Sequence, residues 1–299
     1  MFKNRERQGE VFIIAEAFLW GLFPVVTILA FKQISPLVTY AWSSLFSLIT
    51  FATLITVRKK WREVTDLVAI KDILKATFFI GFCFYGFFFW GLTRTTAGNA
   101  ALLSLTELFF TFLLFNVLRK EHISRKHIIG AILMLFGAGL VLFPNFSHFL
   151  IGDALIVIAT LFAPFGNLYQ QRARKRVSSE TMMFVRDVVV AVVAFGAAAV
   201  LDLGASPVFV KESLLFLMVN GILLFGLSKI FWVESIHRIS VTKASALGSI
   251  YPVFSLLFAW WFLKDMPTVW QLAAFIPLFA GVLLLNYRGS LKEAPVEVG

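Results

Sequence analysis

The sequence predicts an all-α integral membrane protein with ten transmembrane helices, arranged as two five-helix repeats of inverted topology. Three observations lead to this fold class: an apolar composition, ten apolar segments with short connections, and an internal duplication. The 299 residues are 59% hydrophobic and 15% charged, with a mean hydropathy of +0.85. Soluble domains have about 45–50% apolar and about 25% charged residues. The chain therefore has too little polar surface to cover a water-soluble globule.

Ten apolar segments are long enough to cross a bilayer, which requires about 20 residues. The first follows a basic N-terminus and resembles a signal peptide, but it continues to Phe31 and no A-x-A site follows it, so we expect a retained transmembrane helix. The connections are too short to hold a soluble domain. The predicted spans are residues 11–31, 36–57, 73–92, 97–118, 126–144, 152–170, 182–203, 212–233, 241–263 and 268–287.

The basic residues gather in alternate connections. Most of the 27 Lys and Arg residues lie at the N-terminus, in the second, fourth, sixth and eighth connections, and in the tail. The other connections contain only Lys32, Arg94, Lys211 and Lys264. Cytoplasmic loops carry an excess of Lys and Arg, so we expect a multi-pass protein of the plasma (inner) membrane with cytoplasmic N- and C-termini. This distribution also explains the net charge of +10 without a nucleic-acid partner.

The two halves of the chain resemble each other at an offset of 145 residues. Residues 94–124 (RTTAGNAALLSLTELFFTFLLFNVLRKEHIS) then align with the segment from residue 239 to 267 (ISVTKASALGSIYPVFSLLFAWWFLKDMP). Because each predicted repeat, 11–144 and 152–288, has an odd number of spans, equivalent helices cross in opposite directions. Such repeats are typical of secondary transporters with a site near the midplane. Aligned pairs include Ala101 with Ala246, Ser104 with Ser249, Phe109 with Phe254, and Gly21 with Gly166.

Several short motifs occur in the same order in both halves. They are the Trp20-Gly21 pair, the small-residue starts of spans 97–118 and 241–263, Pro252, the turns Arg119-Lys120-Glu121 and Leu263-Lys264-Asp265, and Gly130, Gly137 and Gly281. Over residues 11–288 this arrangement resembles ten-helix, EamA-type members of the drug/metabolite transporter (DMT) superfamily. The resemblance implies export or exchange of small metabolites, such as amino acids, nucleotide sugars, sugar phosphates or drugs.

The sequence departs from the family pattern at two positions. Glu107 stands where the first repeat usually has proline, and the arginine often found near Trp42 is missing. The corresponding arginine of the second repeat is Arg186. The substrate site is therefore not a simple copy of the usual one.

Two acidic residues lie inside predicted spans. A charge at the bilayer centre costs about 2.5–3.5 kcal/mol on insertion scales, so it rarely persists without a use. Glu107 shares a helical face with Ser104 and Thr111, where it could bind an amine or carry a proton; a neutral Glu bonded to a neighbouring helix is the alternative. Glu16 shares a face with Trp20, and it could instead reach the cytoplasmic interface. Glu107 and Glu16 are the candidates for proton coupling.

Further candidates for substrate binding are polar or aromatic residues within spans. Arg186 could pair with a substrate carboxylate or with Glu16, or could reach the cytoplasmic surface, as expected for Lys229. Small residues at the helix starts favour close helix packing. The complete set of candidate substrate-binding residues is Glu16, Trp20, Tyr85, Trp90, Asn99, Glu107, Asn167, Arg186 and Tyr251.

The sequence leaves two classes of function to compare. The favoured one is a secondary transporter that exports small metabolites, amino acids or related amphipathic compounds, by alternating access and with possible proton coupling; an uncoupled facilitator or exchanger is the alternative. A lipid-modifying membrane enzyme is less favoured, because no phosphate loop, HExxH or GxSxG pattern occurs. With one cysteine, Cys83, and scattered histidines, we expect no metal and no cofactor. Both a monomer and a homodimer are compatible with the sequence.

Overall fold

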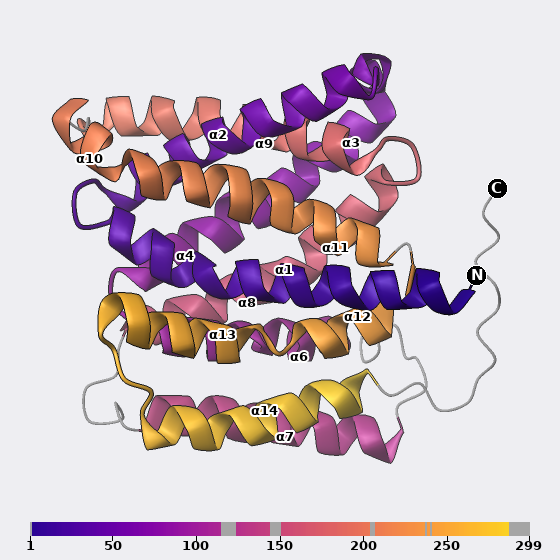
Figure 1. Ribbon diagram of the computed structural model, residues 1–299, viewed down its shortest axis with the longest axis vertical. Coiled ribbons are helices and arrows are strands. Elements are labelled where there is room, and N and C mark those ends of the chain that lie inside the picture. Colours follow the sequence, from indigo (N-terminus) through magenta and orange to yellow (C-terminus); the bar gives the residue numbers. More distant parts are fainter. Residues whose placement is uncertain are drawn as a thin grey trace.

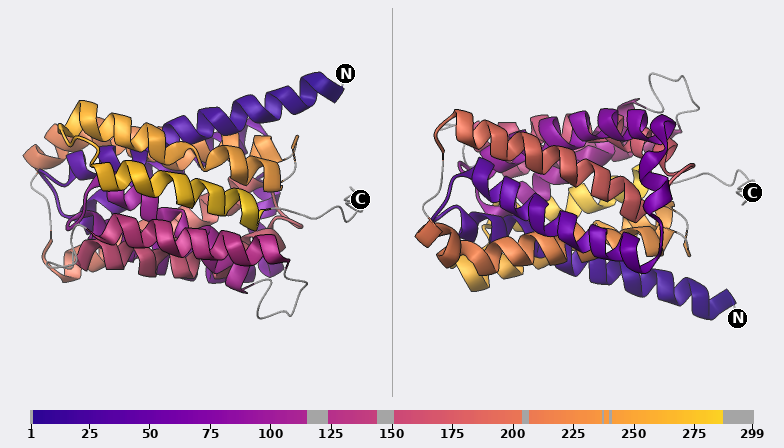
Figure 2. Two further views of the ribbon diagram at one scale, coloured as in Figure 1. Left: turned by 90° about the horizontal axis from the view of Figure 1, so that it is seen from below. Right: turned by 90° about the horizontal axis from the view of Figure 1, so that it is seen from above.

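The computed structural model describes residues 2–114, 124–143, 151–203, 207–236, 238–239 and 241–286. Within these ranges the chain is built from helices and contains no strand. The helices lie side by side in one bundle, in which α1 begins and α14 ends at the same end (Figure 1). The first turns of α1 project beyond the other helices (Figure 2). The predicted Arg119-Lys120-Glu121 turn and the basic tail after residue 286 lie outside the described residues.

The helices follow one another with short connections. In the first half of the chain they are α1 (Phe2–Ala30), α2 (Pro36–Val57), η1 (Trp61–Thr65), α3 (Leu67–Ala76), η2 (Thr77–Phe84), α4 (Tyr85–Leu92), α5 (Ala97–Ser104), α6 (Thr106–Phe112) and α7 (Arg125–Leu142). In the second half they are α8 (Ile151–Ala173), α9 (Ser179–Val200), α10 (Pro207–Met218), η5 (Val219–Leu227), α11 (Ser228–Ile236), α12 (Val241–Gly248), α13 (Tyr251–Phe258), η6 (Ala259–Leu263) and α14 (Val269–Leu285).

Seven helical segments of the described chain are long and apolar enough to cross a membrane. Two further apolar helical segments, Ala97–Phe112 and Val269–Leu285, are shorter. The expected multi-pass, all-helical membrane fold is therefore confirmed. The seven segments are Arg5–Ala30, Pro36–Val57, Arg125–Leu142, Ile151–Ala173, Ser179–Val200, Val210–Ser235 and Ala246–Leu263.

Two predicted spans, 97–118 and 241–263, are interrupted, although the sequence predicted continuous helices. The first is interrupted at Leu105, between α5 and α6, and the second between α12 and α13, where the break is visible in Figure 1. At both breaks the backbone changes to shorter-range bonds: Leu105 N donates to Leu102 O at 3.2 Å, and Ile250 N donates to Leu247 O at 3.4 Å. Leu105 and Ile250 are equivalent at the 145-residue offset.

Serine side chains help to explain these breaks. The Ser104 hydroxyl donates to the carbonyl of Ala100 at 2.6 Å, and the Ser249 hydroxyl donates to that of Ala246 at 2.7 Å. Such bonds compete with the backbone ladder and bend helices. Because Ser104 and Ser249 are aligned in the two halves, the duplication extends to the irregular backbone at this point.

Two π-helical segments also occupy corresponding places. They are η2, between α3 and α4, and η5, between α10 and α11. A π-helical turn changes which side chains face the bundle interior, and such turns are frequent at functional sites. In the second half, Lys229 follows η5 directly.

The helix contacts also repeat between the halves. The helix α1 packs against η5, α11, α12 and α13, whereas α8 packs against η2, α4, α5 and α6. Each first helix of a half therefore contacts the π-containing and interrupted helices of the other half. Two further pairs consist of corresponding helices from the two halves: α2 packs against α9, and α7 packs against α14. The two pairs lie on opposite sides of the bundle (Figure 1).

We predict that Gly21→Leu destabilises the bundle by about 1–3 kcal/mol, the usual effect of overpacking. At Gly21 a Cβ atom would lie 2.7 Å from Phe254 Cβ and 3.0 Å from the Tyr251 carbonyl oxygen, and backbone cannot move aside cheaply. Thermal unfolding of the purified protein measures the effect. The matched control is Gly196→Leu, since no heavy atom lies within 4 Å of a Cβ placed there. Equal stability of the two variants would contradict the close approach of α1 and α13.

Candidate functional site

A buried ion pair joins α1 to α11. Glu16 is 6% exposed; its Oε1 accepts a hydrogen bond from the Ser228 hydroxyl at 3.4 Å and lies 3.9 Å from Lys229 Nζ. The Lys229 ammonium also lies 3.4 Å from the centroid of the Trp20 ring. Aromatic faces attract cations, and more strongly when water is excluded. Lys229, whose side chain is 20% exposed, is therefore held between a carboxylate and an indole instead of extending fully to the surface as expected.

Glu107 lies in the first turn of α6, directly after the break at Leu105. Its Oε1 accepts a hydrogen bond of 2.9 Å from the side-chain amide of Asn167 on α8. No salt bridge to Glu107 is found among the described residues. The two predicted acids thus differ, because Glu16 has a cationic neighbour and Glu107 has a neutral amide.

Tyr251 connects the two interrupted helices. Its hydroxyl donates to the Ala101 carbonyl on α5 at 2.9 Å. In a regular helix that carbonyl would accept from the Leu105 N–H, but this N–H donates to Leu102 instead. The break in the first repeat thus frees the Ala101 carbonyl, which accepts a hydrogen bond from Tyr251 beside the equivalent break in the second repeat.

We predict that Tyr251→Phe costs about 1–3 kcal/mol of stability, the range for a buried polar group that loses its partner. The ring is kept, so the change removes only the hydroxyl that bonds the Ala101 carbonyl. Thermal unfolding of the purified variant measures the loss. An unchanged midpoint would mean that this carbonyl finds another donor and that the bond between the breaks does not stabilise the fold.

These groups interact electrostatically across the bundle interior. The ammonium group of Lys229 interacts electrostatically with the charges of Glu16, Glu107 and Arg186. The hydroxyl group of Tyr251 interacts electrostatically with Glu16 and Glu107. The residues Glu16, Trp20, Glu107, Asn167, Lys229 and Tyr251, referred to below as the central cluster, are connected by these charges, by the contact of Trp20 with Lys229 and by the hydrogen bond of Asn167 to Glu107. Its members come from both halves of the chain, from α1, α6, α8, α11 and α13.

Arg186 lies beside the central cluster but pairs with its neighbour in the sequence. Its guanidinium contacts Asp187 Oδ1 at 2.8 Å, and the Ser47 hydroxyl donates to Asp187 Oδ2 at 2.6 Å. Both side chains are buried, at 7% and 3% exposure. Tyr85 is buried as well, and interacts electrostatically with Arg186 and Glu107. The partner of Arg186 is thus Asp187, and neither Glu16 nor the surface.

Two predicted residues lie away from the central cluster. Trp90 is 51% exposed, with the Arg94 guanidinium 5.9 Å from its ring centroid. Asn99 belongs to a buried polar network at the N-terminal ends of α5, α8 and α14. There its side-chain amide donates to Asp153, and its oxygen accepts from Gln271 at 2.7 Å.

Two partly exposed carboxylates, Glu63 and Asp66, connect helix ends on the side of the bundle where α1 begins. Glu63 Oε2 accepts from Ser178 N at 2.6 Å and from the Thr181 hydroxyl at 2.9 Å, and Arg176 bonds both oxygens of Asp66. Burial raises the pKa of Glu63, but the bonds from Ser178 and Thr181 outweigh it and bring the pKa below its usual value. The Ala69 N–H has the largest effect on Asp66 and lowers its pKa; burial opposes this, and Arg176 lowers the pKa further. Both carboxylates therefore stabilise the fold near neutral pH and stop doing so as the pH falls through these lowered values.

Sequence reasoning did not single out Lys229 as part of the central cluster or Asp187 as the partner of Arg186. Both are charged residues inside apolar segments, which is the signal that identified Glu16 and Glu107. The sequence predicts that Lys229 reaches the membrane interface, because it lies near a helix end. It predicts neither the π-helical segment η5 nor the contact of Lys229 with the face of the Trp20 ring. The described residues contain no group of three or more His, Cys, Asp or Glu that could hold a metal ion.

The family of the chain follows from a comparison of its sequence with known families. The sequence model of the EamA-like transporter family matches twice, over residues 7–143 and 150–287. The chain belongs to the EamA-like transporter family. Its membership in the DMT superfamily, expected from the motifs, is thereby confirmed. Two EamA matches also agree with the paired helix breaks described above.

Individual relatives agree with this assignment. The uncharacterized transporter YoaV of Bacillus subtilis is 18% identical over 285 residues, covering 94% of this chain and 97% of the relative. An uncharacterized transporter of Methanothermobacter thermautotrophicus is 27% identical over 210 residues, covering 68% of this chain and 60% of the relative. One solved crystal structure has the same fold, with a TM-score of 0.67 at 16% identity over 92% of this chain and 95% of the other. These relatives of the EamA protein point to transport rather than to an enzyme.

Proposed function

We propose that this EamA-family transporter is a proton-coupled exporter of small amine-bearing metabolites, of which amino acids are the favoured class. Glu107 carries the proposal, because it is a partly buried carboxylate with a neutral partner, Asn167, beside a break in its helix. Such a carboxylate can be neutralised by a proton or by the ammonium group of a substrate. Competition between the two at one oxygen would couple proton entry to substrate release.

The rest of the central cluster supports a zwitterionic substrate. Lys229 interacts electrostatically with Glu107, so one group could bind a substrate carboxylate while the other binds its ammonium. Trp20 and Tyr251 offer aromatic surfaces between them. In this assignment Glu16 keeps Lys229 in place, and the Arg186–Asp187 pair holds α2 against α9 through Ser47.

The proposed mechanism is alternating access between two inverted five-helix repeats, residues 11–144 and 152–288, with ten spans in total. The reciprocal packing of α1 and α8 supports this symmetry, and so do the equivalent breaks at Leu105 and Ile250. In transporters of this kind, broken helices form the site between the repeats. We place both termini in the cytoplasm and the protein in the plasma membrane from the distribution of Lys and Arg.

The test of this function is transport of a mixed metabolite pool in proteoliposomes, measured by mass spectrometry with and without a pH gradient. We expect a few amine-bearing compounds to move, and to accumulate only when the gradient is present. Accumulation of none, with movement only down each compound's own gradient, would favour the uncoupled facilitator or exchanger. Chemical turnover of a lipid without movement across the membrane would overturn the transporter.

A further inference from the structure

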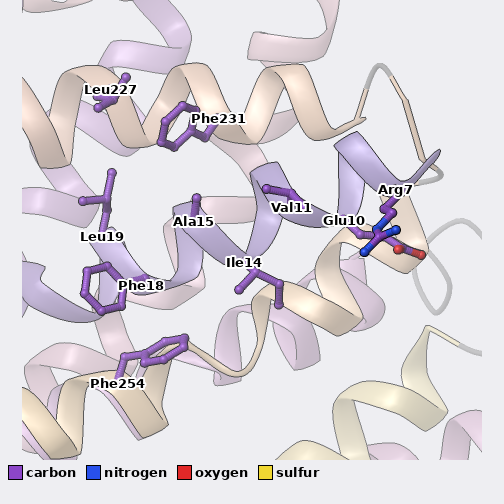
Figure 3. Close-up of a pocket in the computed structure, with 10 residues that line it drawn as sticks. All are labelled: Arg7, Glu10, Val11, Ile14, Ala15, Phe18, Leu19, Leu227, Phe231 and Phe254. Carbon is purple, nitrogen blue, oxygen red and sulfur yellow. The ribbon is translucent and has the colours of Figure 1, made fainter. Parts of the chain in front are cut away.

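Two parts of the outer surface combine apolar and charged side chains. One is a groove of about 630 Å³ along α1, which is lined mostly by apolar side chains and has Arg7 and Glu10 at the end near the start of α1 (Figure 3). Arg7 and Glu10 carry opposite charges, and Glu10 pairs with Lys243. The charges at this groove therefore compensate one another and select no charged ligand. The second part, between α3, η2, α4 and α8, carries uncompensated charge of one sign.

Stacked aromatic rings line the seam between α8 and the helices η2 and α4. Phe87 stacks on Phe162, with ring centroids 5.7 Å apart. Phe79 stacks on Phe165 at 5.4 Å and on Tyr169 at 6.0 Å. Offset stacking is a favourable arrangement for aromatic pairs, and all five side chains are partly exposed. These five residues, referred to below as the aromatic seam, thus form an ordered apolar surface.

The spacing of residues along α8 indicates that the aromatic seam faces outward. Residues three or four positions apart share a helical face, as Phe165 and Tyr169 do. Ile158 and Leu161 belong to the same face and are each 41% exposed, although both are apolar. Asn167 lies on the opposite face, where it bonds Glu107. The helix α8 therefore presents one face to the central cluster and the other to the lipid around the bundle.

Two cations lie over the last ring of the aromatic seam. The Lys75 ammonium on α3 lies 5.3 Å from the centroid of the Tyr169 ring, and the Arg172 guanidinium lies 5.4 Å from the same centroid. Both side chains are exposed. Among the described residues neither forms a salt bridge, not even with Asp72, one turn before Lys75 on α3. Lys71, on the same face of α3 as Lys75, adds a third positive charge.

We propose that Lys75, Arg172 and the aromatic seam form a binding site for one anionic phospholipid. The phosphate lies between the two cations, and an acyl chain follows the stacked rings. Arginine binds phosphate with two parallel hydrogen bonds, and lysine attracts it as a point charge. The cations lie toward the end of the bundle where α1 begins, which we place in the cytoplasm, and the cytoplasmic leaflet is the one rich in anionic lipid.

Charge selects this occupant over two others. A zwitterionic lipid carries its own cation, which would meet the positive charges of Lys75 and Arg172. A soluble phosphate would satisfy the cations but would leave the aromatic seam without a ligand. Because the site is on the outer face of α8, it does not depend on the substrate that the central cluster binds.

The test is lipid binding to the delipidated protein in a neutral detergent, measured by native mass spectrometry. Phosphatidylglycerol and phosphatidylcholine with the same acyl chains are compared by the Kd of the first bound lipid. We expect phosphatidylglycerol to bind about thirtyfold more tightly, the factor for two basic residues near anionic lipid. The double variant Lys75→Gln with Arg172→Gln should lose this preference. Lys75→Arg with Arg172→Lys should keep it, because both charges remain.

The matched control is Arg62→Gln with Lys175→Gln, which removes two exposed charges from the same end of the bundle. It should keep the preference for phosphatidylglycerol. Equal affinity for the two lipids in the native protein would overturn the inference, and so would an equal loss of preference in the control. Glycerol phosphate provides the phosphate without acyl chains. If it binds as tightly as phosphatidylglycerol, the site holds a soluble anion and the lipid assignment is wrong.

Discussion

Glu107→Gln is expected to lower gradient-driven transport by about tenfold to a hundredfold, the factor that corresponds to one hydrogen bond to a charged group. Glutamine has nearly the same shape, and its oxygen can still accept from the Asn167 amide, as Glu107 does at 2.9 Å. The variant should therefore fold, but it can neither release a proton nor offer a charge to an ammonium. Initial rates of substrate uptake with and without a pH gradient measure the effect.

The matched control for this variant is Glu212→Gln, an exposed glutamate on α10. It removes the same charge from the surface, so transport should be unchanged. Uptake by Glu107→Gln that still responds to the pH gradient would assign proton coupling to another group, and Glu16 would be the next to test.

Arg186→Gln should destabilise the protein by about 3–5 kcal/mol, the cost of leaving a buried charge without its partner. Asp187 would then retain only the Ser47 hydroxyl among its described side-chain partners, although it is 3% exposed. Thermal unfolding of the purified variant measures the loss.

A double variant separates the pair from the arginine itself. In Arg186→Gln with Asp187→Asn neither charge of the pair remains, so most of the stability should return. Arg176→Gln is the surface comparison, because Arg176 is half exposed in its pair with Asp66 and should matter far less. A double variant as unstable as Arg186→Gln alone would show that the guanidinium acts through contacts other than Asp187.

Much of the fold could be predicted because bilayer physics acts on composition. Apolar segments of about 20 residues indicate spans without any knowledge of packing, and seven such segments are found in the described chain. The helix breaks could not be predicted in the same way. The sequence places Ser104 on the face of Glu107 and Ser249 among the small packing residues, and neither position predicts that the hydroxyl bonds a carbonyl of the preceding turn.

The candidate site was partly predictable, because charges inside apolar segments stand out. The structure brings Glu16, Trp20, Glu107, Asn167 and Tyr251 into one cluster, and it places Trp90 and Asn99 elsewhere. The contacts of these charged residues were harder to predict from the sequence than the residues themselves. The neighbour of Lys229 depends on how η5 turns α11 toward α1, and the choice of Asp187 by Arg186 depends on side-chain rotamers.

Competition between a proton and a substrate ammonium for Glu107 is the centre of the proposed mechanism. The most direct measurement is proton release on binding of a transported amino acid to the purified protein in nanodiscs, followed with a pH-sensitive dye in weak buffer. We predict about one proton released per bound substrate, as linkage requires when one group loses its proton on binding, and none in Glu107→Gln. Binding to the native protein without proton release, or equal release in Glu107→Gln, would contradict this mechanism.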